Sequence, residues 1–365
     1  MQKVHVVAGA QYGSEGKGHV TAQLVQQALN AGDTHVINVR VAGPNAGHTV
    51  ISPDGDSFAL RTIPVGAALS DDVTCYIAPG SEVDPEVLFS ELDLLRSKGH
   101  HVSRLFISGE ATILTADHKQ REATEGLTAK LGSTGKGIGA ARSDRIMRTA
   151  LRVKDDLDLE DQLASYGVTI REPEDLYSND SITEDQTIVV EGTQGYGLGL
   201  HAGFYPKCTS SDTRAVDFLA MAGISPWRQG TTIQVWLGAR VYPIRVAGNS
   251  GPMKGERSWE ELGLPEEYTT VTHKVRRVGD WDSELVAEAV QANGGRSAYL
   301  AVTMADQLFP GLQKTTTLTE VQVSLSPEKW EEFQQWVKDI ELSAGAEVRM
   351  LTTSPSTCIM IDSKL

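Results

Sequence analysis

The chain has 365 residues, 40% of them hydrophobic, so it is long enough to bury a large core. Its 33 basic and 48 acidic residues give a formal net charge of −15, which argues against a nucleic-acid partner, because such binding relies on Lys and Arg that neutralise phosphates. The three widely spaced cysteines indicate free thiols, and no apolar run reaches the roughly 20 residues of a membrane span, so we expect a cytoplasmic protein with no membrane partner.

Strands alternate with helices along the chain. Apolar runs predict strands at 3–8, 35–41, 74–78, 104–108, 187–191, 232–236, 298–302 and 346–350. Helices are predicted at 17–31, 84–98, 282–293 and 327–342. This order is typical of an α/β fold with a mainly parallel central sheet flanked by helices and long ligand-binding loops. We expect residues 1–365 to form one domain with lobes, with 154–186 as a solvated excursion and 248–268 as a mobile flap.

The first glycine-rich loop, residues 13–18, reads Gly-Ser-Glu-Gly-Lys-Gly and lies between the first predicted strand and the first helix. Backbone N–H groups at the start of a helix attract anions, and glycines let the chain approach phosphate oxygens. Lys17 adds a positive charge that can follow a transferring phosphoryl group. The loop departs from the GxxxxGK[ST] pattern because Gly18 follows the lysine. A P-loop-like phosphate site is therefore favoured over a glycine-rich turn without a ligand.

Two later loops suit phosphate chemistry. Residues 45–49 (Asn-Ala-Gly-His-Thr) follow a predicted strand, and His48 is suited to donate to a phosphate or to a departing oxygen, with a purely structural histidine as the alternative. Residues 132–139 carry hydroxyl groups and many glycines, which suit a second phosphate. Arg145 and Arg148 are three apart, so we expect them on one helix face, where they either bind a phosphate or are simply exposed.

Two further segments complete the pattern. Residues 191–195 read Glu-Gly-Thr-Gln-Gly after another predicted strand. Residues 272–277 (Thr-His-Lys-Val-Arg-Arg) are a basic cluster in an acidic protein and suit a carboxylate substrate. Phosphate loops and a carboxylate clamp together predict a nucleotide, a phosphoryl donor and a small acid as ligands.

The ordered motifs GSEGKG, NAGHT, STGKGIG, EGTQG, YPKCTSSDT and RRVG resemble the adenylosuccinate synthetase family, with matches from residue 8 to about residue 361. The chain is shorter than the usual bacterial members and is nearer in length to the compact archaeal and phage forms. In that family a nucleoside triphosphate phosphorylates the 6-oxo group of a purine monophosphate, and the amine of L-aspartate then displaces the phosphate. The resemblance implies a C–N ligase of purine biosynthesis that uses Mg²⁺ and forms a homodimer.

The resemblance also implies roles for individual residues, including a substrate-phosphate contact that Arg148 makes across the dimer interface. Catalytic roles fall on Ser14, Lys17, His48 and Gln194. The substrates contact Ser14, Glu15, Gly16, Lys17, Asn45, Ala46, Gly47, His48, Thr134, Arg148, Gln194, Thr209, Thr272, Lys274 and Arg276. The triphosphate contacts Gly13, Gly16, Lys17, Gly18, Gly47, Thr49, Arg276, Asp306, Ser354 and Pro355. The metal ligands are Ser14 and the Gly47 carbonyl.

Ser14 departs from the family pattern. The family loop reads G-D-E-G-K-G, and its aspartate removes the proton from purine N1 and binds the metal. A serine hydroxyl is too weak an acid to replace that carboxylate as a base at neutral pH. Its smaller, uncharged side chain leaves room for an amino group at purine C2. In this respect the chain resembles the phage-type 2-aminoadenylosuccinate synthetases, which act on dGMP and supply diaminopurine for viral DNA.

Two more departures bear on specificity. The family's guanine-reading T-K-L-D segment is Thr303-Met304-Ala305-Asp306 here, so ATP or dATP becomes a credible donor beside GTP. Lys274 replaces an arginine that contacts the ribose and the aspartate carboxylate, and the two cations are not equivalent. The leading hypothesis is ligation of L-aspartate to dGMP, in the host cytoplasm if the chain is phage-encoded. The alternatives are adenylosuccinate synthetase acting on IMP with GTP, and a catalytically silent nucleotide-binding subunit.

Overall fold

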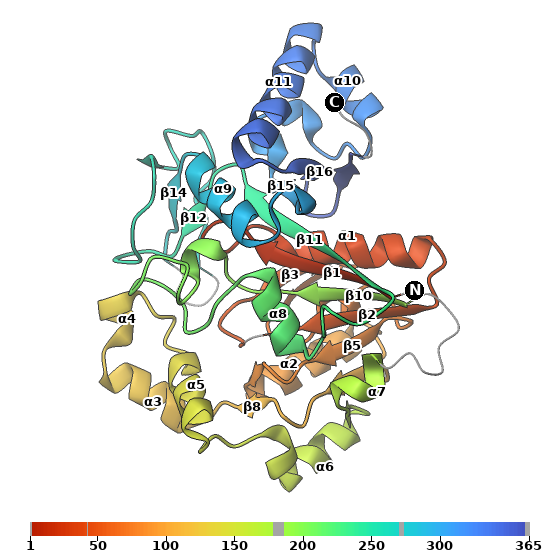
Figure 1. The fold of residues 1–365 in the computed structure, drawn as a ribbon, viewed down its shortest axis with the longest axis vertical. Coiled ribbons are helices and arrows are strands. Elements are labelled where there is room, and N and C mark those ends of the chain that lie inside the picture. Colours follow the sequence, from red (N-terminus) through yellow and green to blue (C-terminus); the bar gives the residue numbers. More distant parts are fainter. Residues whose placement is uncertain (1, 42, 178–185, 270–273, 362–365) are drawn as a thin grey trace. The chain divides into compact units, whose positions relative to one another are not determined.

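The computed structural model describes residues 2–41, 43–177, 186–269 and 274–361. The strands form a mainly parallel central sheet flanked by helices, which confirms the predicted α/β class (Figure 1). The chain divides into two compact units. The first unit comprises Met1–Val7, Thr21–Thr193 and Ala215–Ile233, and the second comprises Ala8–Val20, Gln194–Arg214 and Gln234–Leu365. The expectation of one domain with lobes stays a prediction.

Parallel strands form the centre of the first unit. Their order is β1 (Gln2–Gly9), β10 (Gln186–Glu191), β2 (His35–Arg40), β5 (Thr74–Ile77), β7 (Leu105–Ile107) and β9 (Thr169–Ile170). Every residue of β10 is buried, because β10 lies between β1 and β2. A parallel strand covered on both faces is expected to be a continuous apolar run, as Ile188, Val189 and Val190 are. The polar Glu191 ends this strand.

Helices and short hairpins complete the first unit. The helices are α1 (Lys17–Asn30, which starts in the second unit), α2 (Pro85–Ser97), α3 (Ala116–Thr124), α4 (Leu127–Leu131), α5 (Ile138–Met147), α6 (Leu157–Ser165), α7 (Pro173–Tyr177) and α8 (Ala215–Ala222). Short strands pair as β3 (His48–Ile51) with β4 (Ser57–Leu60), and as β6 (Glu82–Val83) with β8 (Thr112–Ile113).

The segment 154–186, expected to be a solvated excursion, is mostly exposed in its described part, but it is anchored to the sheet by a helix and a strand. Helix α6 buries Leu159 and Leu163, and β9 pairs with β7 at the edge of the sheet. The two leucines are four residues apart and therefore lie on one helix face, a pattern that the acidic composition of the segment conceals.

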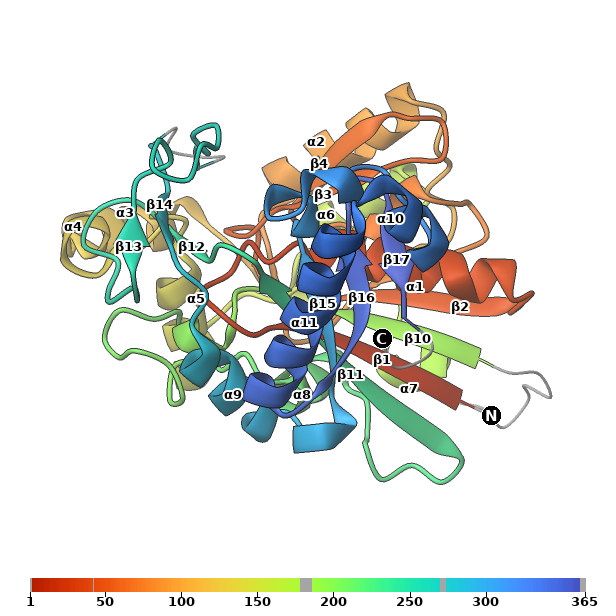
Figure 2. The same ribbon diagram turned by 90° about the horizontal axis from the view of Figure 1, so that it is seen from above.

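The second unit contains β11 (Thr231–Arg240, which starts in the first unit), β15 (Tyr299–Thr303) and β16 (Glu347–Thr352) in parallel, with β17 (Cys358–Met360) antiparallel at the edge. Helix α11 (Pro327–Ala344) packs on α9 (Ser283–Ala292) and on β16 (Figure 2). The remaining helix of this unit is α10 (Leu318–Ser324).

A small antiparallel sheet joins β12 (Ile244–Arg245), β14 (Arg277–Gly279) and β13 (Glu256–Arg257). Trp259 packs with Ile244 and Val278 and retains 5% exposure, so the segment expected to be a flap has a buried anchor. Its mobility stays a prediction.

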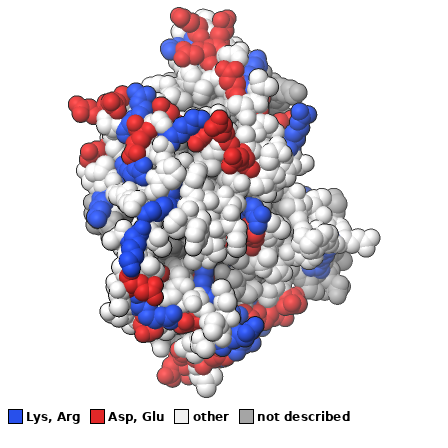
Figure 3. All heavy atoms as spheres, turned by 60° about the vertical axis from the view of Figure 1, so that its left-hand side comes forward, with Lys and Arg blue, Asp and Glu red and all other residues white. Residues whose placement is uncertain are grey.

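On the face shown in Figure 3, Lys and Arg side chains are interspersed with Asp and Glu and do not form one continuous basic surface. Among the described residues, no helix is both long and apolar enough to cross a membrane. The expectation that nucleic acid is not a partner stays a prediction.

Candidate active site

The first glycine-rich loop lies between the end of β1 at Gly9 and the start of α1 at Lys17, as predicted. Glu15 is fully buried inside this loop. Its carboxylate accepts hydrogen bonds from the backbone N–H groups of Gln11 (3.1 Å) and Gly13 (2.7 Å), and from Lys17 Nζ at 2.5 Å. The loop therefore carries an internal anion that fixes two backbone amides and the lysine. Because Glu15 holds Lys17, it sets the position of the positive charge expected to follow the phosphoryl group.

Two glycines make this arrangement possible. A Cβ atom added at Gly9 would lie 2.6 Å from Glu15 Oε2 and 2.6 Å from the Gln194 carbonyl oxygen. A Cβ at Gly195 would overlap Glu15 Oε1. The loop that carries Gln194 thus passes directly beside the first glycine-rich loop, residues 13–18, which also lies in the second unit and is called the phosphate loop below. Gln194 has a φ of 53° and is half-buried.

Ser14 lies at the exposed tip of the phosphate loop with a φ of 60°, in the left-handed region that non-glycine residues seldom adopt. Its hydroxyl accepts a short hydrogen bond from Nη1 of Arg276. Arg276 Nε also donates to the Tyr268 carbonyl, at 3.1 Å. Burial lowers the pKa of Arg276, while the Glu267 carboxylate acts in the opposite direction. The structure therefore brings together a loop residue and a predicted aspartate-binding residue that are far apart in the sequence.

The other members of the basic cluster behave differently. Lys274 is exposed, and its backbone N–H donates to Thr269 Oγ1 at 3.1 Å. Arg277 forms an ion pair with Glu256 and donates to the Gly251 carbonyl at 2.7 Å, so its charge is already neutralised. Among the described basic residues predicted to bind a carboxylate substrate, Arg276 and Lys274 therefore remain candidates. Thr272 lies outside the described residues.

Thr209, predicted to bind the monophosphate, is half-buried in the second unit. Its backbone N–H donates to the Leu198 carbonyl at 2.8 Å, which holds this segment beside the residues that follow Gln194.

The predicted triphosphate residues of the second unit begin next to the phosphate loop. A Cβ at Gly16 would lie 3.1 Å from the methyl carbon of Thr303, so the end of β15 packs on the loop. Met304 follows with a φ of 62°, and its N–H donates to Thr352 Oγ1 at 2.8 Å. Burial raises the pKa of the half-buried Asp306. Gly18 is buried at the start of α1.

Ser354 and Pro355 follow β16. The Ser354 hydroxyl lies 2.7 Å from Thr357 Oγ1, which closes a tight turn, and Pro355 is exposed. This turn and the segment at Asp306 both follow strands that pair with each other in parallel, β16 and β15.

In the first unit, His48 is buried at the start of β3 and contacts two charged residues that sequence reasoning missed as site residues. Its Nδ1 makes a short contact with Glu191 Oε1, and Arg40 Nη1 donates to the same oxygen at 2.7 Å. Arg40 Nη1 also lies 2.5 Å from His48 Nδ1. All three side chains are at least nine-tenths buried. Burial alone would raise the pKa of Glu191, but Arg40 and His48 outweigh it and keep that pKa below its ordinary value.

The loop around His48 is held by arginines. Arg40 Nη2 donates to the Ala46 carbonyl at 2.8 Å, and Arg61 Nε donates to the Pro44 carbonyl at 2.6 Å. Asn45 and Ala46 are half-buried, and Gly47 and Thr49 are exposed.

The loop 132–139, which contains Thr134, is fixed by a carboxylate that the sequence reading also missed. Buried Glu122 accepts from the N–H of Gly139 at 2.9 Å and from the hydroxyl of Ser133 at 3.2 Å. Thr134 is half-buried between these two contacts.

The prediction that Arg145 and Arg148 share a helix face was wrong. Helix α5 ends at Met147, and Arg148 follows it with a φ of 65°. Arg145 pairs with Glu110 at 2.8 Å, whereas Arg148 is exposed. A three-residue spacing places side chains on one face only while the helix continues.

Among the described residues, no group of three or more His, Cys, Asp or Glu is placed to hold a metal ion. Ser14 offers a neutral hydroxyl that already accepts from a guanidinium, and Gly47 offers a carbonyl. Mg²⁺ prefers carboxylate, phosphate and water oxygens. The described side chains therefore do not by themselves make a Mg²⁺ site.

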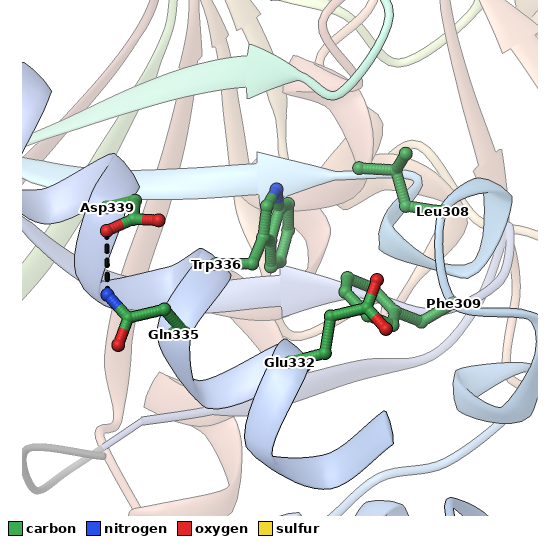
Figure 4. Close-up of a pocket in the computed structure, with 6 residues that line it drawn as sticks. All are labelled: Leu308, Phe309, Glu332, Gln335, Trp336 and Asp339. Carbon is green, nitrogen blue, oxygen red and sulfur yellow. Dashed lines mark hydrogen bonds between the residues drawn. The ribbon is translucent and has the colours of Figure 1, made fainter. Parts of the chain in front are cut away.

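A cavity of about 380 Å³ opens elsewhere in the second unit (Figure 4). Figure 4 shows Trp336 between Asp339 and Glu332, with Phe309 beside it. Leu308 and Gln335 complete the lining of this cavity. None of these residues belongs to the predicted site.

Residues 6–172 and 169–323 match the adenylosuccinate synthetase family. The chain belongs to this family. It is 37% identical to the adenylosuccinate synthetase of Pyrococcus horikoshii over 362 residues, which cover 98% of this chain and 97% of the relative. It is 32% identical to that of Methanococcus vannielii over 363 residues, 98% of each chain. It is therefore a C–N ligase that depends on a nucleoside triphosphate; members of the family generally use GTP and Mg²⁺.

Solved structures of similar proteins cover the whole fold. One is the cyanophage S-2L succinoaminodeoxyadenylate synthetase (PurZ), described as bound to dGMP and to dATP as an energy donor. It is 26% identical, covers 100% of this chain and 97% of that one, and has a TM-score of 0.76. The fully ligated adenylosuccinate synthetase of Plasmodium falciparum is 20% identical, with coverage of 98% and 100% and a TM-score of 0.77, and supports the fold alone.

One feature of the sequence could have identified Arg40 and Glu191 as site residues. Each is a charged residue at the end of an apolar predicted strand, immediately before a loop that carries chemistry. Charges are rarely buried unless they are paired, so two opposite charges in such positions indicate a pair. Glu122 gives no such signal, because it lies within a highly charged helix.

Proposed function

We propose that the protein joins L-aspartate to C6 of dGMP through a 6-phosphoryl intermediate and releases 2-amino-2′-deoxyadenylosuccinate for diaminopurine DNA synthesis. The observation that carries this proposal is Ser14, with its hydroxyl bonded to Arg276, at the loop position where the family pattern has an aspartate. The similarity to a cyanophage enzyme described as bound to dGMP and dATP supports it.

The chemistry of Ser14 favours a purine with a 2-amino group. A carboxylate at this position would accept the N1 proton, whereas a serine hydroxyl cannot act as that base at neutral pH. The hydroxyl is smaller and neutral, and its oxygen can accept a hydrogen bond from an amino group on C2. Arg276 donates to the same oxygen, which leaves it one lone pair to offer.

The remaining roles follow from the family pattern. Lys17, fixed by Glu15, holds the transferring phosphoryl group, and His48 stabilises that group and the oxyanion at C6. The monophosphate is bound by Asn45, Thr134, Gln194 and Thr209, and aspartate by Thr272, Lys274 and Arg276.

For the donor, we propose ATP or dATP in preference to GTP. Asp306 retains the carboxylate that pairs with the N1 and N2 hydrogens of guanine in the family pattern. Met304, however, replaces the lysine that packs beside the base in that pattern, so one contact to guanine is lost. Mg²⁺ enters with the triphosphate, whose oxygens supply most of its ligands and whose charge it neutralises.

We also propose a homodimer in which Arg148 reaches the partner's substrate phosphate. Arg148 is exposed beyond α5 and is surrounded in the sequence by exposed apolar side chains. Ile146 is 75% exposed and Met147 is 68% exposed, and Leu151 is 39% exposed. Contiguous exposed apolar side chains are typical of an interaction surface.

The decisive experiment incubates the purified full chain with L-aspartate, Mg²⁺ and a triphosphate, offering dGMP and IMP in parallel reactions, with product detected by mass spectrometry. We expect kcat/KM for dGMP to exceed that for IMP at least about tenfold, because unmatched polar groups strongly disfavour the wrong substrate. Turnover of IMP with none of dGMP would overturn the proposal.

The second candidate is an adenylosuccinate synthetase that acts on IMP with GTP. Its support is the identity of 37% and 32% to archaeal adenylosuccinate synthetases over nearly the whole chain. This candidate requires a base other than Ser14, such as a substrate phosphate or a water. It predicts that Ser14→Asp maintains or raises IMP turnover in the same assay, whereas the dGMP proposal predicts that this variant loses dGMP turnover.

A further inference from the structure

We infer that Glu191 and Arg40 are positioning residues that hold His48 as the tautomer protonated at Nδ1, so that Nε2 is the ring nitrogen that exchanges a hydrogen bond with the reacting groups. The inference rests on the proposed role of His48 at the substrate oxygen. Neither Glu191 nor Arg40 is assigned a role by the motifs that predict the site.

The strand register brings the two charges together. Arg40 and Glu191 are paired residues at the ends of the adjacent parallel strands β2 and β10. Arg40 Nη1 lies 2.7 Å from Glu191 Oε1, and both side chains are 0% exposed. A pair this deeply buried is costly to form and costly to break, so its geometry is well defined.

Hydrogen-bond chemistry decides the tautomer. Glu191 Oε1 makes a short contact with His48 Nδ1, and an ionised carboxylate can only accept. Arg40 keeps Glu191 ionised, because the guanidinium holds the carboxylate pKa below its usual value despite full burial. The proton between the two atoms therefore belongs to Nδ1. Arg40 Nη1 carries two N–H groups; it donates to Glu191 Oε1 at 2.7 Å and also lies 2.5 Å from Nδ1 and 3.4 Å from Nε2 of His48. An unprotonated Nδ1 could accept from it, but the short contact between Nδ1 and the carboxylate oxygen would then join two lone pairs with no proton between them, which disfavours that tautomer.

Arg40 also fixes the backbone that carries His48. Its second nitrogen, Nη2, donates to the carbonyls of Ala46 at 2.8 Å and Arg61 at 3.3 Å. Glu191 Oε2 accepts from the N–H of Val65 at 3.1 Å. The pair thus connects the two strand ends to the histidine loop and to the segment that follows β4. Such partners orient a histidine ring and set its basicity.

Glutamine at position 191 cannot reproduce this network. Three donors converge on Glu191: Arg40 and His48 on one oxygen, and Val65 on the other. Glutamine offers one acceptor oxygen and places two N–H donors where the second oxygen was. At least one donor therefore loses its acceptor.

The test that does not depend on turnover is ¹⁵N NMR of the full chain labelled at histidine, recorded at about pH 9, above the ordinary histidine pKa. We expect His48, assigned by its loss in His48→Gln, to show a protonated Nδ1 and an unprotonated Nε2. Glu191→Gln and Arg40→Lys should shift the ring towards a mixture of tautomers. A wild-type ring protonated at Nε2 would overturn the inference, as would an unchanged tautomer in Glu191→Gln.

The kinetic test compares Glu191→Gln with Glu91→Gln. Glu91 is an equally sized buried carboxylate that accepts three backbone N–H bonds from residues 61–63 and acts on Arg40 through its charge. We expect Glu191→Gln to lower kcat about 100-fold, as for loss of acid–base catalysis, with KM for the monophosphate changed less than about threefold. Glu91→Gln should lower stability without this loss of kcat. Equal effects of both variants on kcat would show a structural role only.

The two proposals fail in different ways. If the chain turns over IMP and not dGMP, the kinetic comparison is made with IMP and the tautomer measurement is unaffected. If dGMP is turned over but the tautomer is reversed, the positioning inference fails and the proposed function remains.

Discussion

Arg40 and Glu191 end neighbouring parallel strands at the same register position, with Arg40 Nη1 2.7 Å from Glu191 Oε1 and both side chains fully buried. The two residues are 151 positions apart in the sequence. The charged pair lies in the first unit at the point where the β2 and β10 strands end and their loops begin. It therefore contributes to the fold and to the predicted site at the same time.

Removal of one partner of this pair should strongly destabilise the protein. Arg40→Met leaves the Glu191 carboxylate buried without its cation, which typically costs about 3–5 kcal/mol. Urea unfolding followed by circular dichroism measures this difference. Arg40→Lys retains the charge but loses the bonds to the Ala46 and Arg61 carbonyls, so we expect a smaller loss. A loss below about 1 kcal/mol for Arg40→Met would contradict the structure, because surface changes fall in that range.

Glu15 should control the phosphate loop. Glu15→Gln replaces a carboxylate that accepts from Gln11, Gly13 and Lys17 with a group that has one acceptor, so the lysine loses its buried partner. We expect KM for the triphosphate to rise at least about tenfold and the stability to fall by about 1–3 kcal/mol. Steady-state kinetics at saturating aspartate give the first value. Ser14→Ala is the control within the same loop, since it removes only the exposed contact with Arg276, and its triphosphate KM should change little.

An aspartate in place of Ser14 should compete with the amino-acid substrate for Arg276. The Arg276 guanidinium already contacts the Ser14 hydroxyl, so a carboxylate there would form a charge-assisted pair with it. We expect Ser14→Asp to raise KM for L-aspartate several-fold, about 0.5–1 kcal/mol, because the pair is partly exposed. Backbone strain should not obscure the result, since aspartate tolerates the left-handed conformation of this position. Ser14→Asn, which has the same shape without the charge, should leave that KM nearly unchanged.

Two half-buried histidines should make the free energy of unfolding depend on pH. Burial, with a smaller contribution from Lys3, lowers the pKa of His5 from 6.5 to about 4, although Asp33 acts in the opposite direction. As the pH falls, the folded state therefore protonates His5 at a lower pH than the unfolded state does. The stability that the protein gains from a neutral His5 is complete above pH 6.5 and is lost as the pH falls towards about 4.

For one histidine this loss is at most about 1.4 kcal/mol per pH unit, and less here because the His5 ring is not fully buried. Burial also lowers the pKa of His19 to about 4, so the losses of stability from the two histidines add. Unfolding free energies measured between pH 7 and pH 4 should show a flatter profile in His5→Gln than in the wild type. The exposed His101→Gln variant controls for loss of a histidine, and an unchanged slope in His5→Gln would rule out the assignment.

Much of the fold near the site could be predicted from local pattern. Strand β1, helix α1 and the loop between them were found because an apolar run, a glycine cluster and a helical spacing are all properties of adjacent residues. The end of α5 was not found, because Arg148 continues the helical spacing in sequence and leaves the helix only in its backbone angle. The anchoring of segment 154–186 was not foreseen, because two buried leucines are few among its charged residues.

By itself, the sequence determined the class of the fold, the place of the glycine-rich loop 13–18 between a strand and a helix, and the family, since motifs of adjacent residues in a fixed order carry that information. Tertiary structure alone decided which groups meet. Strand β10 lies between β1 and β2 although it is far from both in the sequence, and this order places Glu191 beside Arg40 and His48. The burial of Glu15 against Gly9 and Gly195 has the same origin. Strand order and close backbone packing depend on long-range contacts, and no local pattern of residue types encodes a partner that lies more than a hundred residues away.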